Sequence, residues 1–90
     1  MKNLSEENLL IILQALADPI RLNIFRCLLK NGERSVSCGE YHIAKSTLSH
    51  HIKVLKEAEL IELRKEGTTH FYSVNKARIN EAPSFFECLK

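Results

Sequence analysis

The chain has few of the residues that mark several classes of protein. Its 90 residues include only three cysteines, three glycines, two prolines and no tryptophan. The cysteines show no CxxC spacing, which argues against a disulfide scaffold and suits a reducing compartment. No apolar run approaches the roughly 20 residues that a membrane span requires. The start, MKNLSEENLL, carries acids where a signal peptide carries positive charge, so we expect a cytoplasmic protein with no membrane partner.

Motifs of the common enzyme classes are also missing. The sequence contains no glycine-rich phosphate loop, no HExxH and no nucleophile elbow. Cysteine, histidine and aspartate all occur, but 90 residues are expected to hold all three by chance. We therefore expect a protein that is not an enzyme and that uses no cofactor.

What is present is the composition of one small globular domain. Hydrophobic residues make up 44% of the chain and charged residues 27%, and neither a repeat nor a linker divides residues 1–90. The net charge of +2 is too small to indicate a nucleic-acid partner by itself. Residues 1–40 hold five basic and five acidic side chains, whereas residues 41–76 hold six and four. The small basic excess therefore falls on the second half.

Apolar periodicity predicts two helices in the first third of the chain. Ser5 is placed to cap the first helix, whose apolar positions are Leu9, Leu10, Ile11, Ile12, Leu13 and Leu16. So wide an apolar surface needs burial on more than one side, either in the core or against a second chain. Asp18-Pro19 is typical of the start of a second helix, and Asn31-Gly32 of its end. In that helix we expect Arg21, Asn23, Arg26 and Lys30 to be exposed and Cys27 to lie in the core.

A clearer helix is predicted at about residues 46–58, after a short one that starts at Ser35 or Ser37 and runs through Tyr41. At 100° per residue, Leu48, Ile52 and Leu55 form a core stripe, and Ser46, Ser49, His50 and Lys53 lie opposite. His51 falls at the edge of the stripe, where we expect a hydrogen-bonded structural residue.

Two strands and a last helix complete the predicted order. The strands run from Leu60 to Lys65 and from Phe71 to Val74, around a turn at Gly67, which places a hairpin at about residues 61–74. Asn75 is placed to cap a short final helix, which Pro83 interrupts. This order predicts a mainly α protein with a small β-hairpin, the plan of a winged helix-turn-helix domain.

Three segments of the chain resemble the ArsR family of winged-helix transcriptional repressors. They are LADPIRLNIFRCLL, STLSHHIKVLKEAELI and KEGTTHFYSV, and the resemblance covers roughly residues 10 to 80. It implies a homodimer that binds an operator near a promoter and releases it in response to a signal, often a metal ion. It also implies that STLSHHIKVL is the recognition helix and LRKEGTTHFY the wing.

The chain departs from the family pattern where metal ions usually bind. Many members carry an ELCVC-like stretch, but here ERSVSC puts Ser35 and Ser37 where the thiolates would be, and hydroxyls are poor substitutes for soft ligands. The last segment, NKARINEAPSFFECLK, has no histidine for the family's other metal site. Ala44 stands where the family usually has a capping serine, so either Ser46 caps a later helix start or the turn differs. The CGE stretch resembles a branch of the family, and this resemblance implies no particular inducer.

Cys38 and His42 lie four residues apart, which on a helix puts both on one face within reach of one ion. Two ligands do not make a site, so the expected arrangement is a half-buried cysteine beside an exposed histidine, and we predict no metal site. A redox-sensing thiol at Cys38 stays open as an alternative.

The residues expected to contact double-stranded DNA lie on the recognition helix and the wing. They are Lys45, Ser46, Thr47, Ser49, His50 and Lys53 on the helix, and Arg64, Lys65, Thr68 and Thr69 on the wing. Hydroxyls, imidazole and lysine can bond to base edges or phosphates. We expect a sequence-specific transcriptional regulator, with repression taken from the resemblance alone. It would dimerise through its first and last helices on an inverted-repeat operator. The alternative is a winged-helix module that binds protein instead.

Overall fold

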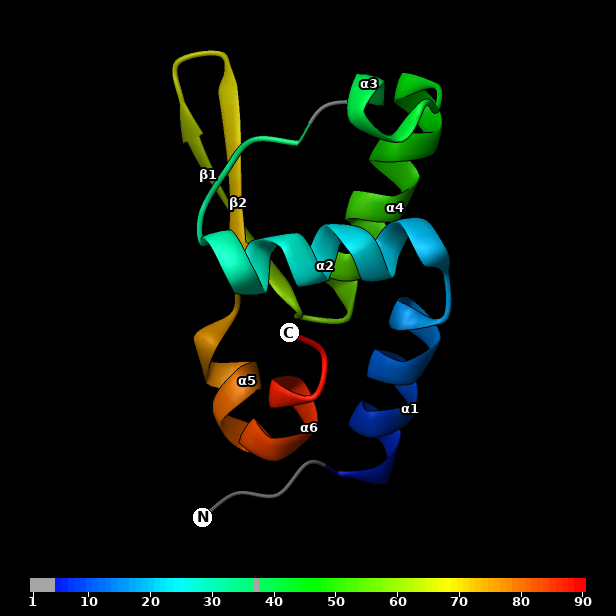
Figure 1. Cartoon of the computed structure of the whole chain (residues 1–90), viewed down its shortest axis with the longest axis vertical. Helices are drawn as coiled ribbons and strands as arrows, with labels where there is room; N and C mark the ends of the chain where they lie inside the picture. Colours follow the sequence, from blue (N-terminus) through cyan, green and yellow to red (C-terminus); the bar gives the residue numbers. More distant parts are fainter. Residues whose placement is uncertain (1–4, 37) are drawn as a thin grey trace.

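The helices and the hairpin occur in the order that the sequence predicts. A computed structural model describes residues 5–36 and 38–90. Its elements are α1 (Glu6–Leu16), α2 (Pro19–Asn31), α3 (Cys38–Tyr41), α4 (Lys45–Glu57), β1 (Ile61–Glu66), β2 (Thr69–Val74), α5 (Lys76–Glu81) and α6 (Pro83–Glu87). Helix α2 crosses the middle of the molecule, with α4 and the hairpin on one side and α1, α5 and α6 on the other (Figure 1). The mainly α fold with a small β-hairpin is confirmed.

Local signals in the sequence set the ends of the first two helices. The Ser5 hydroxyl accepts a hydrogen bond from the Asn8 amide at 3.1 Å. The Asp18 carboxylate accepts from the amides of Ile20 and Arg21 at 2.9 and 3.0 Å. Gly32 ends α2 with φ of +79°, a conformation that side chains disfavour. These three predictions are confirmed.

The core is built from residues of α1, α2, α4, β1 and α6 and of the turn after α4. Phe25 of α2, Leu55 of α4 and Phe86 of α6 are each buried to at least 99%. The rings of Phe25 and Phe86 lie 5.9 Å apart, between centroids, at a tilt of 57°. Burying a side chain of this kind contributes about 1.5–3 kcal/mol. The inner side of α4 is therefore fixed against the core, and its other side faces outward.

The hairpin pairs β1 with β2 in an antiparallel register that runs from Ile61 opposite Val74 to Glu66 opposite Thr69. Gly67 takes φ of +61° in the turn between them. Arg34, in the segment before α3, adds an isolated bridge to Tyr72 of β2. The hairpin therefore presents one face to α4 and an opposite, outer face.

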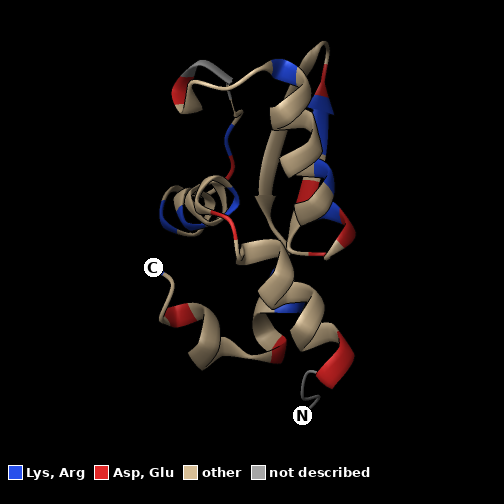
Figure 2. Ribbon diagram, turned by 90° about the vertical axis from the view of Figure 1, so that its right-hand side faces the viewer, with Lys and Arg blue, Asp and Glu red and all other residues tan. Residues whose placement is uncertain are grey.

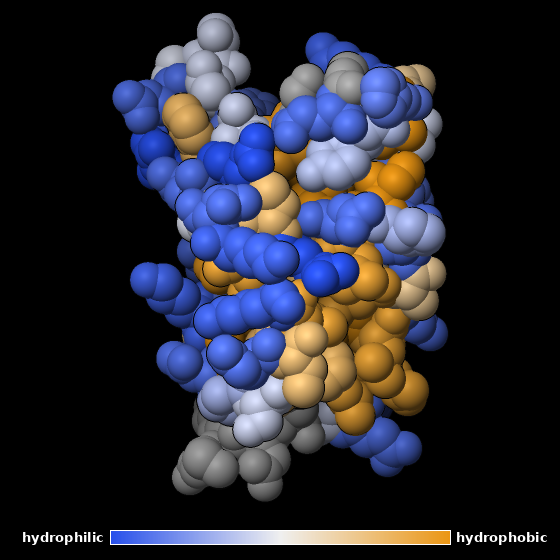
Figure 3. Space-filling view, viewed as in Figure 1, coloured by the Kyte–Doolittle hydropathy of each residue, from blue (hydrophilic) through white to orange (hydrophobic). Residues whose placement is uncertain are grey.

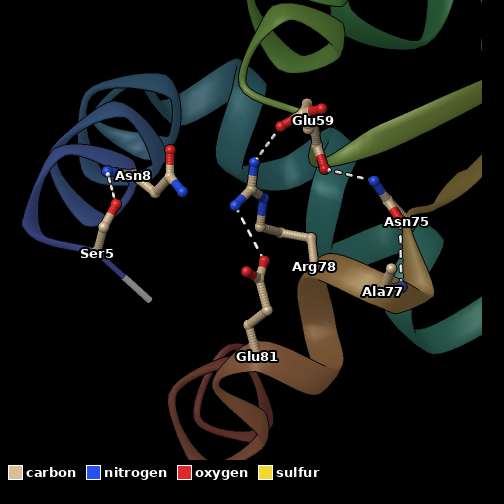
Figure 4. Close-up of polar contacts among 7 residues, drawn as sticks. All are labelled: Ser5, Asn8, Glu59, Asn75, Ala77, Arg78 and Glu81. Carbon is tan, nitrogen blue, oxygen red and sulfur yellow. Dashed lines mark hydrogen bonds and ion pairs between the residues drawn. The ribbon is translucent and has the colours of Figure 1, made fainter. Parts of the chain in front are cut away.

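Polar contacts tie α5 to the turn after α4 (Figure 4). Arg78 of α5 is only 7% exposed, and its guanidinium donates to the carboxylates of Glu59 and, at 2.9 Å, Glu81. Glu59 has φ of +59°, and its carbonyl accepts from Asn75 Nδ2 at 3.0 Å. Asn75 also caps α5, as predicted. Pro83 does more than interrupt the last helix, because it begins α6 as that helix's first residue.

Three expectations for α2 were wrong. Arg21 and Arg26 are not freely exposed, because each donates to backbone carbonyls of other segments. Arg26 Nε bonds to the Leu89 carbonyl at 2.8 Å. Cys27 is half-buried rather than in the core, and its sulfur accepts from Arg34 Nη1 at 2.9 Å. Each partner lies on another segment, which periodicity within one helix cannot reveal.

Across residues 5–36 and 38–90, no single helix has the length and apolar character needed to cross a membrane. Taken together, α1 and α2 reach that length and apolar composition, but the chain bends by 104° between them.

Candidate nucleic-acid interface

Helix α4 begins at Lys45 without a side-chain cap. Ala44 is the N-cap residue, with extended backbone angles and no side-chain bond. Ser46 is already inside the first helical turn, so the prediction that it might cap a later start is wrong. A capping residue must have an extended backbone.

A groove with a volume of about 740 Å³ lies between α4 and the hairpin. It opens at the end of the molecule where the hairpin and the start of α4 stand apart (Figure 3). Its lining includes Lys45, Ser49, Lys53, Lys56 and Glu57 of α4, and Leu63, Lys65, Thr68, Thr69, His70 and Tyr72 of the hairpin, together with Ser35, Val36, Leu48 and Ile52. A helix and a β-hairpin therefore line the same groove, and many of the side chains that they contribute to it are polar.

Six of the ten residues predicted to contact DNA line this groove: Lys45, Ser49, Lys53, Lys65, Thr68 and Thr69. Ser46, Thr47 and His50 are exposed on α4 but lie outside the lining. The recognition-helix residues thus divide into a groove-facing set and an outward-facing set.

Sequence reasoning missed Lys56, His70 and Ser35, which also line the groove. A signal for Lys56 was present, because Lys45, Ser49 and Lys56 follow one another at helical spacings of four and seven. His70 sits directly opposite Lys65 in the strand register. Predicting that required the exact pairing of the two strands. Ser35 occupies the position where the family resemblance suggested a metal-binding thiolate, and here it faces the groove.

The groove is strongly basic at its rim and apolar beneath. Four lysines line it against a single carboxylate, that of Glu57. Among the described residues, none of these lysines has a recorded ion pair. Ile52 and Tyr72 lie beneath, and burial raises the pKa of the Tyr72 phenol above its ordinary value. Figure 2 shows the basic segments of α4 and the hairpin in the half of the molecule away from the acidic start of α1.

Arg64 lies on the outer face of the hairpin rather than in the groove. Its guanidinium contacts Glu33 at 2.8 Å and Glu66 at 2.6 Å, and it stacks over the Phe71 ring at 4.7 Å. The hydrogen bond to Glu33, followed by the one to Glu66, raises the pKa of Arg64. In turn, the hydrogen bond from Arg64 lowers the pKa of Glu33 below its usual value. The charge of Arg64 is therefore engaged by carboxylates, whereas no ion pair of Lys65 is recorded within residues 5–36 and 38–90.

His51 is a buried, hydrogen-bonded residue, as predicted. It is 8% exposed, and its Nδ1 lies 3.1 Å from Arg21 Nη1 and 3.9 Å from Asp18 Oδ2. The backbone hydrogen bond from Arg21 is the main cause of the lowered pKa of Asp18, and the positive charge of the Arg21 side chain lowers it further. This network lies on the core side of α4, away from the groove.

The described residues contain no group of three or more histidine, cysteine, aspartate or glutamate side chains placed to hold a metal ion. His42 is exposed, with φ of +54°. Ser37 and the side chain of Cys38 lie outside the described part of the chain, so the arrangement predicted for Cys38 and His42 stays a prediction.

Comparison with known proteins adds to this geometry. Residues 16–64 match the family described as helix-turn-helix domain. An uncharacterized helix-turn-helix-type transcriptional regulator of Methanocaldococcus jannaschii is 39% identical over 72 residues, which span 78% of this chain and 81% of the relative. An arsenical resistance operon repressor of Staphylococcus xylosus is 37% identical over 81 residues, which span 80% of this chain and 70% of the relative.

The whole fold also matches a solved structure. It is the solution structure of a homodimeric winged helix-turn-helix DNA-binding domain of Mycobacterium bovis, a possible ArsR-family transcriptional regulator. The TM-score is 0.74 at 25% identity, over 99% of this chain and 89% of that one. With the same order of helices and hairpin and these relatives, the chain belongs to the ArsR family of winged helix-turn-helix transcriptional regulators.

Proposed function

We propose that the chain binds duplex DNA with the groove between α4 and the hairpin and with the exposed face of α4. The observation that carries this proposal is the set of four lysines that line the groove without recorded ion pairs among the described residues. Lysines so placed attract the phosphates of a nucleic-acid backbone and release its counterions. Membership of a family of transcriptional regulators supports the same assignment.

Within this interface, the groove-lining lysines and the outward-facing residues of α4 have different roles. Lys45, Lys53 and Lys65 contact phosphates along the groove. Ser46, Thr47 and His50 face outward, where an α-helix entering the major groove meets base edges. The predicted DNA contact of Arg64 is the weakest part of the interface, because Glu33 and Glu66 already occupy its guanidinium. We assign Arg64 the role of holding the wing against the segment before α3.

The functional unit that we propose is a homodimer. Leu10, Ile11 and Leu13 of α1 are between 43% and 52% exposed. Figure 3 shows an apolar surface on the side of the molecule where α1 lies. Burying this surface against a second chain, with a contribution from the last helices, would remove it from water. The related domain of Mycobacterium bovis is described as homodimeric.

Two-fold symmetry gives the operator its form. Two α4 helices related by the dimer axis would enter successive major grooves about 34 Å apart, on an imperfect inverted repeat. Relatives from Staphylococcus xylosus and Bacillus subtilis are named repressors, so we propose repression, exerted in the cytoplasm.

The test is binding of the purified protein to the duplex upstream of its own gene across a salt series, with and without zinc. DNA binding through groove lysines predicts that log K falls linearly with log salt, by about 0.9 for each phosphate neutralised. A scrambled duplex of the same length is the control. Absence of binding to either duplex would contradict the proposal and favour a module that binds protein. Loss of binding on adding zinc would instead reveal a metal site that includes Cys38 or His42.

A further inference from the structure

One side chain of α2, that of Arg21, contacts two other helices at once. Arg21 belongs to α2, and its Nε donates to the Ala15 carbonyl of α1 at 2.7 Å. Its Nη2 donates to the Gln14 carbonyl of α1 at 3.4 Å, and its Nη1 lies 3.1 Å from Nδ1 of His51 in α4. The end of α1 and the middle of the recognition helix are therefore joined through one guanidinium.

The partners on α1 explain why an arginine is needed. The last carbonyls of a helix have no amide partner within it, so the Ala15 carbonyl presents an acceptor at the end of α1. The Gln14 carbonyl already accepts from the Ala17 amide at 3.3 Å, and its second lone pair can accept from Arg21. A guanidinium has five N–H donors in a fixed planar fork and can meet acceptors on several sides. Lysine carries the same charge as a single compact group without that fork. Position 21 therefore needs the fork as well as the charge.

The contact with His51 also fixes the state of the imidazole. Arg21 can only donate, so Nδ1 of His51 must be the acceptor, and the ring is then neutral with its hydrogen on Nε2. Asp18 Oδ2 lies 3.9 Å from Nδ1, and the His50 ring lies 6.0 Å away between centroids. In the described chain these and Arg21 are the charged or titratable groups recorded around the ring. Helix α1 adds only the two uncharged carbonyls that Arg21 holds.

We infer that Arg21 and His51 are positioning residues that hold the recognition helix in its DNA-reading orientation relative to α1. The inference rests on the proposed function and deepens it. His51 neighbours His50, which we place on the base-reading face of α4, so a shift of the buried ring moves that face. The hydrogen bonds of Arg21 also link the recognition helix to α1, the helix proposed to contact the second chain. The geometry of the dimer and the position of the base-reading face then depend on the same hydrogen bonds.

A positioning role predicts a selective loss. Specific binding depends on where α4 lies to within about an ångström, whereas non-specific binding depends mainly on the charge of the lysines. Breaking the Arg21–His51 contact should therefore weaken binding to the operator and leave binding to a scrambled duplex unchanged. A purely structural role would lower the melting temperature but leave the operator preference of the folded protein intact.

Four variants test the inference. His51→Leu removes the acceptor, whereas His51→Asn places an amide oxygen near the position of Nδ1 and should restore the bond. Arg21→Lys keeps the charge but loses the fork. The matched control is Arg26→Lys, which changes an arginine of the same helix whose recorded partner is Leu89 rather than α4. Circular dichroism and sedimentation confirm that each variant is folded and dimeric at the assay temperature.

The expected result is a loss of about tenfold in operator affinity for His51→Leu and Arg21→Lys, with unchanged affinity for the scrambled duplex. His51→Asn and Arg26→Lys should stay near the parent protein.

Two outcomes would overturn the inference. If the parent prefers its operator and His51→Leu retains that preference, the contact does not position α4. If His51→Asn is as weak as His51→Leu, the ring's shape matters rather than its hydrogen bond. Should Arg21→Lys fail to fold, the two His51 variants still decide. A parent protein that binds no operator would be a different failure, that of the proposed function itself.

Discussion

The two faces of the hairpin each carry a basic residue, but the two residues differ in their ion pairing. On the face toward α4, Lys65 stands opposite His70 in the groove, with no ion pair recorded for it among the described residues. On the outer face, the neighbouring Arg64 is held by Glu33 and Glu66. One residue along a strand reverses the side to which a cation points. The net charge of +2 therefore does not indicate the property that matters for binding DNA, which is how many cations on one face of the hairpin and α4 have no ion pair.

The largest expected effect comes from disrupting the core that holds α4, and with it the groove, in place. Leu55 of α4 is fully buried beneath the groove. Its replacement by alanine should lower the free energy of unfolding by about 2–5 kcal/mol, because the site loses buried apolar contact and gains a cavity. Urea denaturation measures this. Lys30→Ala, at an exposed site of α2 outside the core, the groove lining and the proposed dimer surface, is the control and should change stability by less than about 0.5 kcal/mol. An unshifted Leu55→Ala curve would contradict the description of the core.

The next effect concerns the groove face alone. In Lys53→Gln/Lys65→Gln, two groove cations are removed without disturbing the core. Binding to operator and scrambled duplexes should weaken alike, and the slope of log K against log salt should fall by about 2. Lys30→Gln/Lys76→Gln, which removes two exposed lysines outside the groove lining, should leave the slope unchanged. Equal slopes for the two double variants would mean that the groove does not hold the backbone.

A direct contrast of neighbours tests the difference between the faces. Lys65→Gln should lower the salt slope by about 1, whereas Arg64→Gln should leave it unchanged because that guanidinium already faces carboxylates. Titrations of the two variants on the same duplex decide the matter. If Arg64→Gln produces the larger drop, Arg64 leaves Glu33 when DNA arrives, and the outer face is part of the interface.

The smallest effect is a pH dependence of the outer face. Arg64 lowers the pKa of Glu33 from its ordinary value of 4.5. A lowered folded-state pKa gives stability that is present above about pH 4.5 and is lost as pH falls through the folded value. Melting temperatures of the parent and Glu33→Gln should therefore converge as the solution is taken from pH 6 toward pH 3. A difference that stays constant over this range would show that the ion pair does not contribute to stability.

Much of the fold was predictable because its signals are local. Caps at Ser5, Asp18 and Asn75 act within three residues of themselves, and the stripe of Leu55 repeats within one helix. Lys53 was predicted on the exposed side of α4 by the same periodicity and Lys65 by its place in the wing, whereas Lys56 was missed. Sequence reasoning therefore recovered the elements and most of the groove.

What escaped prediction depends on contacts between distant segments. Glu33 and Arg64 are 31 positions apart, and Arg26 and Leu89 are 63 apart, so neither pairing shows in a local pattern. The same holds for Arg21, which appears as an exposed cation on a helical wheel but meets His51 in another helix. Whether a charged side chain is buried, and which groups it bonds to, depends on tertiary contacts that are not visible in the local pattern of a single sequence.

The turn after α4 places position 59 under two opposing demands. Its left-handed backbone favours glycine or asparagine, at a cost of roughly 1–2 kcal/mol for other residues. The buried guanidinium of Arg78 requires a carboxylate at the same place. Over evolutionary time these demands cannot be relaxed independently. Homologues in which residue 78 has lost its positive charge are expected to carry glycine or asparagine at position 59, so the two sites should vary together.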